Sequence, residues 1–545
     1  MARVDAMPEG AKELLQTGSV IEREFSYKLI KQLTGLPEQE LLSHMSALKD
    51  SELLYERGIY PQSTYIFKHA LTQQVVYESI LTKRKKKLHE EIGNAIEELF
   101  KDNIDEQYGV LAAHFIAGDN YEKGAEYSRL AGKKALKAAL FIEAIAHTKK
   151  RVACLESLPR TDDIQKRIID ARTALANYFL TINRHPESKE AVWPIVDLAL
   201  ELNYQRGLPG IYTAIGIYTL WVEEDYPKGL KYLNDVLKIS EKIGDFLSLF
   251  FANFYLGWTY SWNCEFEKAL AFLNKSLQLS ALANNPIGIS FTKGITSAGN
   301  YSFNGKIDLA YQASKELIRI ADETDDIFIK GMACSTFGSS CYFKGLFEEA
   351  EDYLLKGLAL CEKTAQAGWK AWAYFFLGHT YFELDEHMKA REYYKGGINT
   401  LEAVNMLPSW INMAKVSLAR AEALYDSQWA NVSELSNELS NYYEENNLKV
   451  IEGWMANYIG EILLNIDDQH LSEAEDWIKN AIETDQKYGM MWSLANDYAL
   501  YADLFKRKGD KSKAKENLYK AIEIYKECGA DGWVEKAEKE MVAFS

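Results

Sequence analysis

The chain has 545 residues, of which 47% are hydrophobic and 26% charged, and its formal net charge is −17. Single domains usually comprise about 100–200 residues, so this length excludes one compact core but suits a repeat that grows in one dimension. The negative charge argues against a nucleic-acid surface over the whole protein, because affinity for phosphates depends on clustered lysine and arginine. No apolar run approaches the roughly 18–20 residues that cross a bilayer, and we expect a cytoplasmic protein with no membrane partner.

The sequence lacks the motifs that mark common catalytic sites. No GxxxxGK[ST] phosphate loop, HExxH, GxSxG or glycine-rich kinase loop occurs. The cysteines are scattered without CxxC spacing, which favours reduced thiols over disulfides or a zinc site: Cys154, Cys264, Cys334, Cys341, Cys361 and Cys528. We therefore expect no catalytic residue, cofactor or metal site in this chain, and no enzymatic activity.

The N-terminal block predicts a small winged-helix domain. Helices are expected at 10–16, 26–33 and 38–49, followed by two alternating segments, 52–57 and 64–68, that a turn at Gly58–Pro61 joins into one β-hairpin. A helix is expected from Leu81 to Phe100, opened by the basic run Lys83–Lys87. That run is interpreted as a solvated helix face in preference to a phosphate or lipid patch. Residues 1–105 are assigned to this domain and its connecting helix.

A winged helix also suggests DNA binding, in which the third helix would enter the major groove. Here that helix carries Glu38, Glu40 and one terminal lysine, Lys49. Carboxylates are repelled by phosphates, and His44 and Gln39 are the only plausible base contacts. The sequence therefore argues against nucleic acid as a partner.

Beyond residue 105 small residues recur about every 40 positions. The first series is Gly229, Ala269, Ala310, Ala350, Ala390, Ala474 and Ala514, with Val432 at the position where the period predicts one; the step from Ala269 to Ala310 is 41. A second series lies 12 residues before most of these: Gly257, Ala298, Gly338, Gly378 and Ala502. Two small positions per period indicate two closely packed helices per unit, and such a period is typical of a solenoid.

The predicted divisions are first helical repeats at 106–160, units of about 40 residues at 161–528, and a capping helix at 529–545. The residues around the small positions resemble the tetratricopeptide repeat. Leu256-Gly257-x-x-Tyr260 with Phe266-x-x-Ala269, and Leu377-Gly378-x-x-Tyr381 with His387-x-x-Ala390, match its two helices. The period exceeds the usual ~34 residues, and the closing proline is absent. The resemblance implies an all-α fold: a right-handed superhelix preceded by the winged-helix domain.

The N-terminal block resembles a segment of signalling ATPases. Glu13–Phe25 together with Phe67–Leu81 looks like the region that joins a STAND-class ATPase module to tetratricopeptide repeats in bacterial proteins, which often carry an adenylate/guanylate cyclase or kinase domain. The resemblance implies that His69, in Phe67-Lys-His-Ala-Leu71, contacts the β-phosphate of ADP when an ATPase module is present; the alternative is a structural histidine that caps or packs. Because no ATPase motif occurs here, we expect the C-terminal portion of a larger protein, or a chain that acts with a separate ATPase chain.

Tryptophans are frequent in the repeats, and most are expected in the core. Trp258 with Trp262, and Trp369 with Trp372, lie about one turn apart on first helices and are our candidates for binding a protein partner or small effector in the concave groove. With the acidic background they would favour cationic or mixed apolar-basic ligands. The expected function is a non-catalytic sensor or scaffold that relays binding to an ATPase, cyclase or kinase module in cis or in trans. The alternatives are an autonomous interaction scaffold and a DNA-binding regulator.

Overall fold

The computed structural model describes residues 4, 7–138, 140–425 and 432–543. The chain divides into two compact units, Met1–Tyr178 (unit 1) and Phe179–Ser545 (unit 2), and helix α10 (Asp162–Thr181) crosses the division. Within the described ranges no helix is long and apolar enough to span a membrane. The finer division at residues 105, 160 and 528 stays a prediction.

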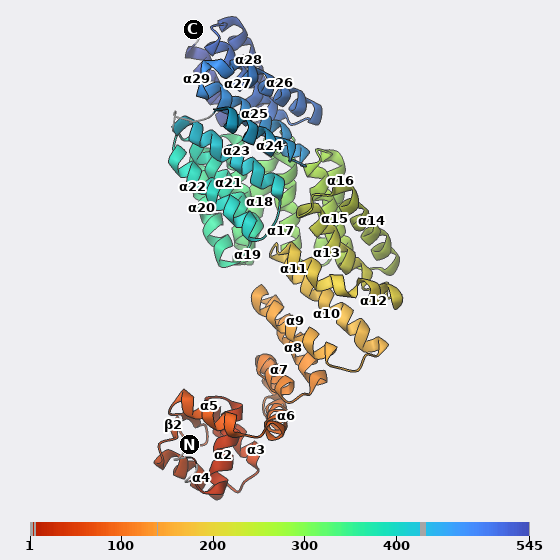
Figure 1. Cartoon of the computed structure of the whole chain (residues 1–545), viewed down its shortest axis with the longest axis vertical. Helices are drawn as coiled ribbons and strands as arrows, with labels where there is room; N and C mark the ends of the chain where they lie inside the picture. Colours follow the sequence, from red (N-terminus) through yellow and green to blue (C-terminus); the bar gives the residue numbers. More distant parts are fainter. Residues whose placement is uncertain (1–3, 5–6, 139, 426–431, 544–545) are drawn as a thin grey trace. The chain divides into compact units, whose positions relative to one another are not determined.

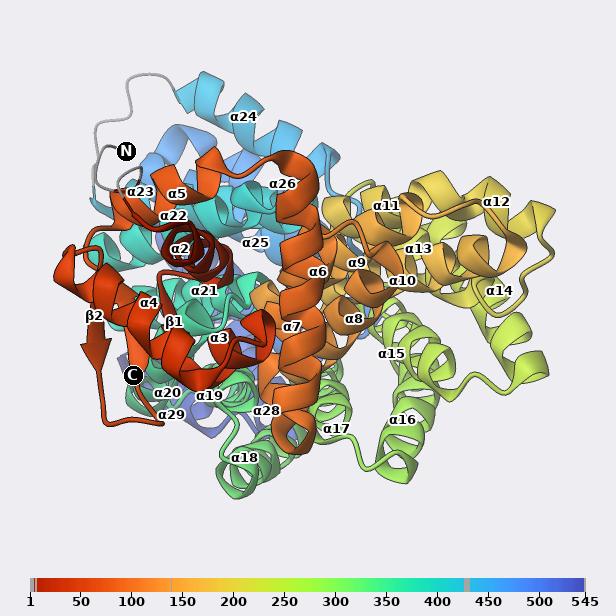
Figure 2. The same ribbon diagram turned by 90° about the horizontal axis from the view of Figure 1, so that it is seen from below.

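Unit 1 begins with the predicted helices and hairpin, in the order α2 (Glu9–Ile21), β1 (Glu24–Ser26), α3 (Tyr27–Thr34), α4 (Glu38–Asp50), β2 (Leu54–Arg57) and β3 (Thr64–Phe67). The strands form an antiparallel sheet in the order β1-β3-β2, with Phe25 opposite Tyr65 and Tyr55 opposite Ile66. Strand β1 was not predicted, because three residues are too few to show an alternating pattern. Helices α2, α3 and α4 lie beside the strands (Figure 2), and Leu15, Ile30 and Phe67 are fully buried.

The rest of unit 1 is helical: α5 (Ala70–Ser79), α6 (Thr82–Leu99), a 3₁₀ helix η1 (Lys101–Gln107), α7 (Tyr108–Ala117), α8 (Tyr121–Lys137) and α9 (Phe141–Glu156). Helix α6 is the predicted helix with the basic run, and it packs against α2, α3 and α7. Lys86 pairs with Asp119 at 2.5 Å, and Arg84 with Glu13 at 3.6 Å. These ion pairs within unit 1 favour the interpretation of the run as an ordinary helix face.

Unit 2 is a superhelix of antiparallel helix pairs of the tetratricopeptide type, as the sequence predicts (Figure 1). Its helices after α10 are α11 (His185–Val192), η2 (Trp193–Ile195), α12 (Val196–Glu201), α13 (Leu208–Trp221), α14 (Tyr226–Ile243), α15 (Phe246–Trp262), α16 (Phe266–Leu282), α17 (Pro286–Gly294), η3 (Ile295–Tyr301), α18 (Ile307–Thr324), α19 (Ile327–Lys344), α20 (Phe347–Lys363), α21 (Ala367–Glu383), α22 (His387–Ala403), α23 (Pro408–Tyr425), α24 (Val432–Glu444), α25 (Lys449–Ile466), η4 (Asp468–His470), α26 (Leu471–Tyr488), α27 (Met491–Arg507), α28 (Lys511–Cys528) and α29 (Asp531–Ala543).

The two series of small residues lie where the helices of one pair meet. The residues of the first series, from Gly229 to Ala514, lie on second helices; the side chain of Val432 falls outside the described residues. On the first helices, a Cβ added to Gly257, Gly338 or Gly378 would lie 2.5–2.6 Å from a side chain 16 residues further along the chain. Those side chains are Leu273, Leu354 and Tyr394. The spacing in the sequence therefore reflects a contact repeated in each pair.

Most helices end at a residue in the left-handed backbone region, the usual stop signal of a helix C-terminus. From residue 183 to 405 these residues follow one another every 20 or 21 positions: Asn183, Asn203, Glu224, Gly244, Cys264, Asn284, Gly305, Asp325, Gly345, Ala365, Asp385 and Asn405. They replace the closing proline of the standard repeat. Nine of the twelve are glycine, asparagine or aspartate, the residues that adopt this conformation most readily; Glu224, Cys264 and Ala365 are the exceptions.

The superhelix of unit 2 is closed by contacts between successive turns. After α13, Glu224 accepts hydrogen bonds from the backbone N–H and the hydroxyl of Ser409 in α23, at 3.1 and 2.6 Å. At the end of α19, Lys344 pairs with Asp531 in α29 at 2.7 Å, and α15 contacts α25. In each case a first helix meets the fifth first helix further along. The sequence predicted an open concave groove, whereas here the interior is packed with side chains.

Candidate functional site

An apolar cavity lies inside the superhelix of unit 2, with a volume of about 80 Å³. Residues of α13, α15, α17, η3, α21 and α23 line it, together with the C-terminal ends of α10 and α22. Its rings are Trp221, Phe250, Phe251, Phe254, Tyr255, Trp258, Trp262, Phe291, Trp369, Trp372, Phe375 and Trp410. We call this space the aromatic cavity.

All four candidate tryptophans line the aromatic cavity. Trp262 and Trp369 are buried, whereas Trp258 and Trp372 are half-buried. The rings of Trp258 and Trp262 meet edge to face at 5.4 Å, and Trp372 meets Trp410 at 5.6 Å. The structure thus brings together two tryptophan pairs that are more than 100 residues apart in the sequence. Their role in binding stays a proposal.

Four indole N–H groups around this cavity have no hydrogen-bond partner among the described residues: those of Trp221, Trp262, Trp372 and Trp410. A buried tryptophan usually finds an acceptor for its N–H, and a donor left without one costs about 1–3 kcal/mol. The polar side chains in the lining belong to Thr181 and Asn183, together with the Tyr255 hydroxyl. Asn183 already accepts a hydrogen bond from the backbone N–H of Gly368 at 3.1 Å.

The lining described by the structure contains no charged side chain. We had expected carboxylates of the acidic repeats beside the tryptophans, which would favour basic ligands. That expectation is wrong for this cavity, because its walls are first helices, and the carboxylates are concentrated on the second helices and turns. The surroundings suit an apolar group that carries hydrogen-bond acceptors.

One wall of the cavity is a π-helix, η3, which contributes Ile295, Ala298 and Gly299. A π-helical turn within an α-helix accommodates one additional residue, and such turns are frequent at functional sites. The left-handed residues Asn284 and Gly305 on either side are 21 positions apart, and the small-residue step here is 41. The extra residue is therefore accommodated inside the helix, where it reshapes the cavity wall.

Sequence reasoning missed Trp221 and Trp410 as lining residues, although a signal existed. Aromatic residues recur at one position near the end of the first helices, at Trp221, Trp262, Phe303 and Phe343, with steps of 41, 41 and 40. The Phe303 ring lies 6.4 Å from Trp410 and 5.6 Å from Phe343. These rings continue the aromatic lining along the superhelix interior.

In unit 1, His69 is exposed immediately before α5, and its side chain does not cap that helix. It is therefore accessible to solvent. His44, the candidate DNA contact, packs against α2, since a Cβ added to Gly10 would lie 2.5 Å from its ring. Glu40 lies 3.8 Å from the same ring. This position within the domain makes His44 a poor reader of base edges.

Two segments, residues 332–403 and 498–528, match family models of the tetratricopeptide repeat. They cover α19 to α22 and α27 with α28. The comparison with curated proteins finds no match.

Solved structures with similar helical repeats include a Rap protein complexed with Competence and Sporulation Factor (16% identity, 72% of this chain and 99% of that chain, TM-score 0.43). NprR in complex with its cognate peptide NprX is 14% identical over 65% of this chain and 98% of that chain, with a TM-score of 0.45. A STAND protein with a tetratricopeptide repeat sensor from Pyrococcus horikoshii is 14% identical over 99% of this chain and 66% of that chain, with a TM-score of 0.27. The function proposed below rests on the aromatic cavity itself.

Proposed function

We propose that unit 2 is a non-catalytic sensor that takes an apolar group of a peptide or small effector into the aromatic cavity. The observation that carries this proposal is the set of four unpartnered indole N–H groups around one apolar space. Packing alone gives no reason to bury several donors without acceptors. A ligand with carbonyl or carboxylate oxygens beside an apolar group would satisfy both the donors and the rings.

The volume of the aromatic cavity also restricts the size of the group that can enter it. An apolar cavity of about 150 Å³ holds benzene, so 80 Å³ fits a smaller group such as the side chain of valine or leucine. Peptide backbone places carbonyl oxygens next to each side chain. A peptide segment of a protein partner, or an effector with a branched aliphatic group and an amide, therefore fits this site.

Binding would be relayed through unit 1 to a STAND-type ATPase module, linked to an adenylate cyclase or a kinase, in cis or in trans. The residues that support this part are Glu13–Phe25 and Phe67–Leu81, which resemble the joining segment of such proteins. The exposed position of His69 leaves it free to meet a phosphate of that module.

The experiment selects binders from a random peptide library with the full chain, and then measures the affinity of a selected peptide by calorimetry. The test variant is Ala371→Leu, which fills the cavity from α21, where Ala371 is buried in the lining. The control is Ala359→Leu, at an exposed position of α20. We expect peptides with a shared aliphatic residue, at least tenfold weaker binding to Ala371→Leu, and unchanged binding to the control.

Since Ala371→Leu also adds strain of about 1–3 kcal/mol, Trp372→Phe serves as a second variant that keeps a ring and removes one N–H. Loss of one hydrogen bond predicts about 3- to 10-fold weaker binding. Equal affinity of the selected peptides for wild type, Ala371→Leu and Trp372→Phe would overturn the proposal.

Hydrogen exchange distinguishes a sensor that relays binding through unit 1 from an autonomous interaction scaffold. Addition of a selected peptide should slow exchange in α15, α21 and α23 in both cases. Relay predicts a further change in α5 and α6 of unit 1. No change there would leave an autonomous interaction scaffold as the function.

A further inference from the structure

A second cavity of unit 2, with a volume of about 330 Å³, lies among the C-terminal helices. Residues of α21, α23, α25, α27 and α29 line most of it. Its rings include Tyr342, Trp454, Tyr458, Trp492, Tyr525 and Trp533. In contrast to the aromatic cavity, it also carries cations and carboxylates, so we call it the polar cavity.

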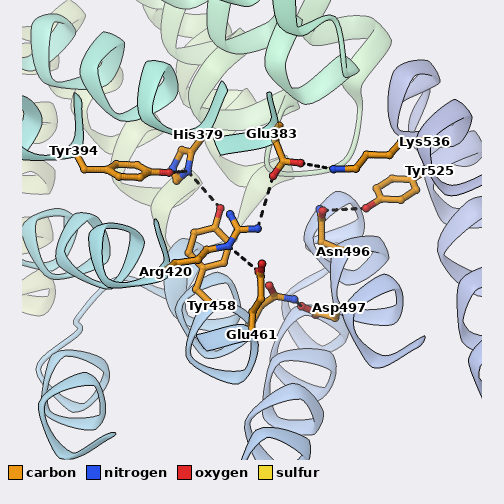
Figure 3. A network of polar contacts seen from close by, with 11 residues as sticks. His379, Glu383, Tyr394, Arg420, Tyr458, Glu461, Asn496, Asp497, Tyr525 and Lys536 are labelled. Carbon is orange, nitrogen blue, oxygen red and sulfur yellow. Dashed lines mark hydrogen bonds and ion pairs between the residues drawn. The ribbon is translucent and has the colours of Figure 1, made fainter. Parts of the chain in front are cut away.

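Charged groups of the polar cavity form a network of hydrogen bonds and ion pairs (Figure 3). The Arg420 guanidinium is stacked between Phe382 and Tyr458, 3.6 and 4.1 Å from the ring centroids. Its Nε donates to Glu461 at 2.7 Å, and its Nη2 lies 3.7 Å from Glu383. Lys536 donates to the other oxygen of Glu383 at 2.7 Å. Two carboxylates of the cavity are therefore already neutralised by the protein.

Two donors at the same wall remain without an acceptor among the described residues. They are Nη1 of Arg420 and Nε1 of Trp492. The Arg420 side chain is only 10% exposed, and the indole of Trp492 is buried as well. A charged donor buried without an acceptor is costly, and it favours any ligand that brings an oxygen to it.

Two further carboxylates line the polar cavity. Neither Asp503 on α27 nor Glu540 on α29 has an ion-pair partner in the part of the chain that the structure describes. Asp503 is accessible to solvent at the cavity. The surrounding protein, followed by the charge of Glu540, raises the pKa of Asp503 to about 6, against the opposing effect of Lys506 and Lys536. A cation placed there would relieve the repulsion between the two carboxylates.

We propose that the polar cavity binds a small zwitterion, such as a free amino acid or a dipeptide. Its carboxylate accepts from Arg420, and its ammonium group pairs with Asp503 and Glu540. The volume lies at the lower end of the roughly 300–1,000 Å³ of small-molecule sites, and the rings provide faces that attract an ammonium group. This site goes beyond the function proposed for the aromatic cavity and does not depend on it.

The test titrates the full chain with matched probes by calorimetry: L-norleucine, hexanoate, which lacks the ammonium group, and pentylamine, which lacks the carboxylate. Glycyl-L-norleucine distinguishes a dipeptide from a free amino acid. We expect norleucine or its dipeptide to bind, and each truncated probe to bind at least tenfold more weakly. Binding of pentylamine as tight as that of norleucine would overturn the proposal in favour of a plain cation site.

The variant is Asp503→Asn with Glu540→Gln, which leaves the Arg420 network intact; Glu535→Gln, at an exposed position of α29, is the control. We expect the double variant to lose at least tenfold in affinity for norleucine at an unchanged melting temperature, and the control to bind as wild type. Ala371→Leu in the aromatic cavity should not affect norleucine binding. No binding of either zwitterion at millimolar concentration, or equal binding to the double variant, would contradict the proposal.

Discussion

Asp485 and Asp497 form a buried carboxyl pair between α26 and α27. Both side chains are fully enclosed, and Asn457 donates to Asp497 at 2.8 Å. Gly453 makes room for the pair, because a Cβ there would overlap the Asp485 carboxyl group. Burial, together with the charge of Asp497, holds the pKa of Asp485 well above its ordinary value, and burial raises that of Asp497 as well. The pair is therefore expected to share a proton.

This pair predicts a stability that falls as pH rises. In the unfolded chain an aspartate titrates near 3.9, and the folded pKa values are higher, so the folded state binds more protons. The full stabilisation exists below the unfolded pKa and is lost as pH rises toward the folded values. Asp485→Asn, which replaces the proton by an amide donor, should stabilise the protein at pH 8 by at least about 1 kcal/mol, since one pKa unit corresponds to ~1.4 kcal/mol.

Thermal unfolding at pH 5 and pH 8 measures this effect. Asp476→Asn, an exposed position of the same helix α26, is the control and should show the pH dependence of wild type. If Asp485→Asn and wild type lose the same stability between the two pH values, the pair does not share a proton.

At the scale of the helix pair, Gly378 is the contact between α21 and α22. Its position faces Tyr394, which is fully buried and whose hydroxyl lies 2.8 Å from Nδ1 of His379. Burial and this hydrogen bond hold the ring opposite the position of the added Cβ. Gly378→Ala should therefore overpack the pair at a cost of about 1–3 kcal/mol.

Gly294→Ala is the matched control, because a Cβ there meets its neighbours at ordinary distances of 3.4–3.5 Å. It should be neutral or stabilising, since alanine is the better helix former. Denaturant unfolding compares the two variants. If both variants have the same stability, the assignment of Gly378 to the contact between α21 and α22 is wrong.

At a helix end, Ala365 lies between α20 and α21 with φ 56°. An L-residue pays about 1–2 kcal/mol for the left-handed conformation, which glycine adopts freely. Ala365→Gly removes this cost but increases the entropy of the unfolded chain. The net free energy of unfolding should therefore rise by about 0.5–1 kcal/mol. The same change at Ala359, exposed within α20, should lower it by about 0.5–1 kcal/mol. Equal signs for the two substitutions would contradict the assignment of Ala365 as a helix stop.

The helix pairs and helix ends show how much of this fold could be predicted from the sequence. The positions of Gly257, Gly338 and Gly378 were enough to place both helices of each pair, because close contacts accept only small residues. Three of the helix stops, Ala365, Cys264 and Glu224, were not visible, because these residue types carry no turn signal. The tryptophan pairs were recognised as candidates, but the convergence of Trp258 and Trp372 depends on the curvature of the superhelix. The polar cavity depends on contacts between α21 and α29, which no local pattern encodes.

At the scale of the molecule, the turns of unit 2 are coupled. A solenoid is usually approximated by contacts between neighbouring repeats alone, which implies that damage in one repeat spreads only locally. Glu224 is buried and bonded to Ser409, 185 residues further along. Loss of this acceptor leaves a buried backbone N–H unsatisfied, at a cost of about 1–3 kcal/mol.

Glu224→Ala should therefore speed hydrogen exchange at the end of α13 and, equally, at the start of α23. Glu223→Ala is the control, because Glu223 is exposed and its ion pairs with Lys189 and Lys228 are local. An effect of Glu224→Ala that stops at the repeats adjacent to α13 would mean that the turns are independent.

The contacts between a first helix and the fifth first helix further along also restrict how such a chain can evolve. Repeat arrays commonly gain or lose whole units by gene duplication, since each unit depends only on its neighbours. Here an additional unit between α13 and α23 would move Ser409 away from Glu224. If it lay between α19 and α23, it would also separate Lys344 from Asp531. These contacts therefore constrain the number of units between partners, whereas a single additional residue, as in the π-helix η3, leaves the partners in place.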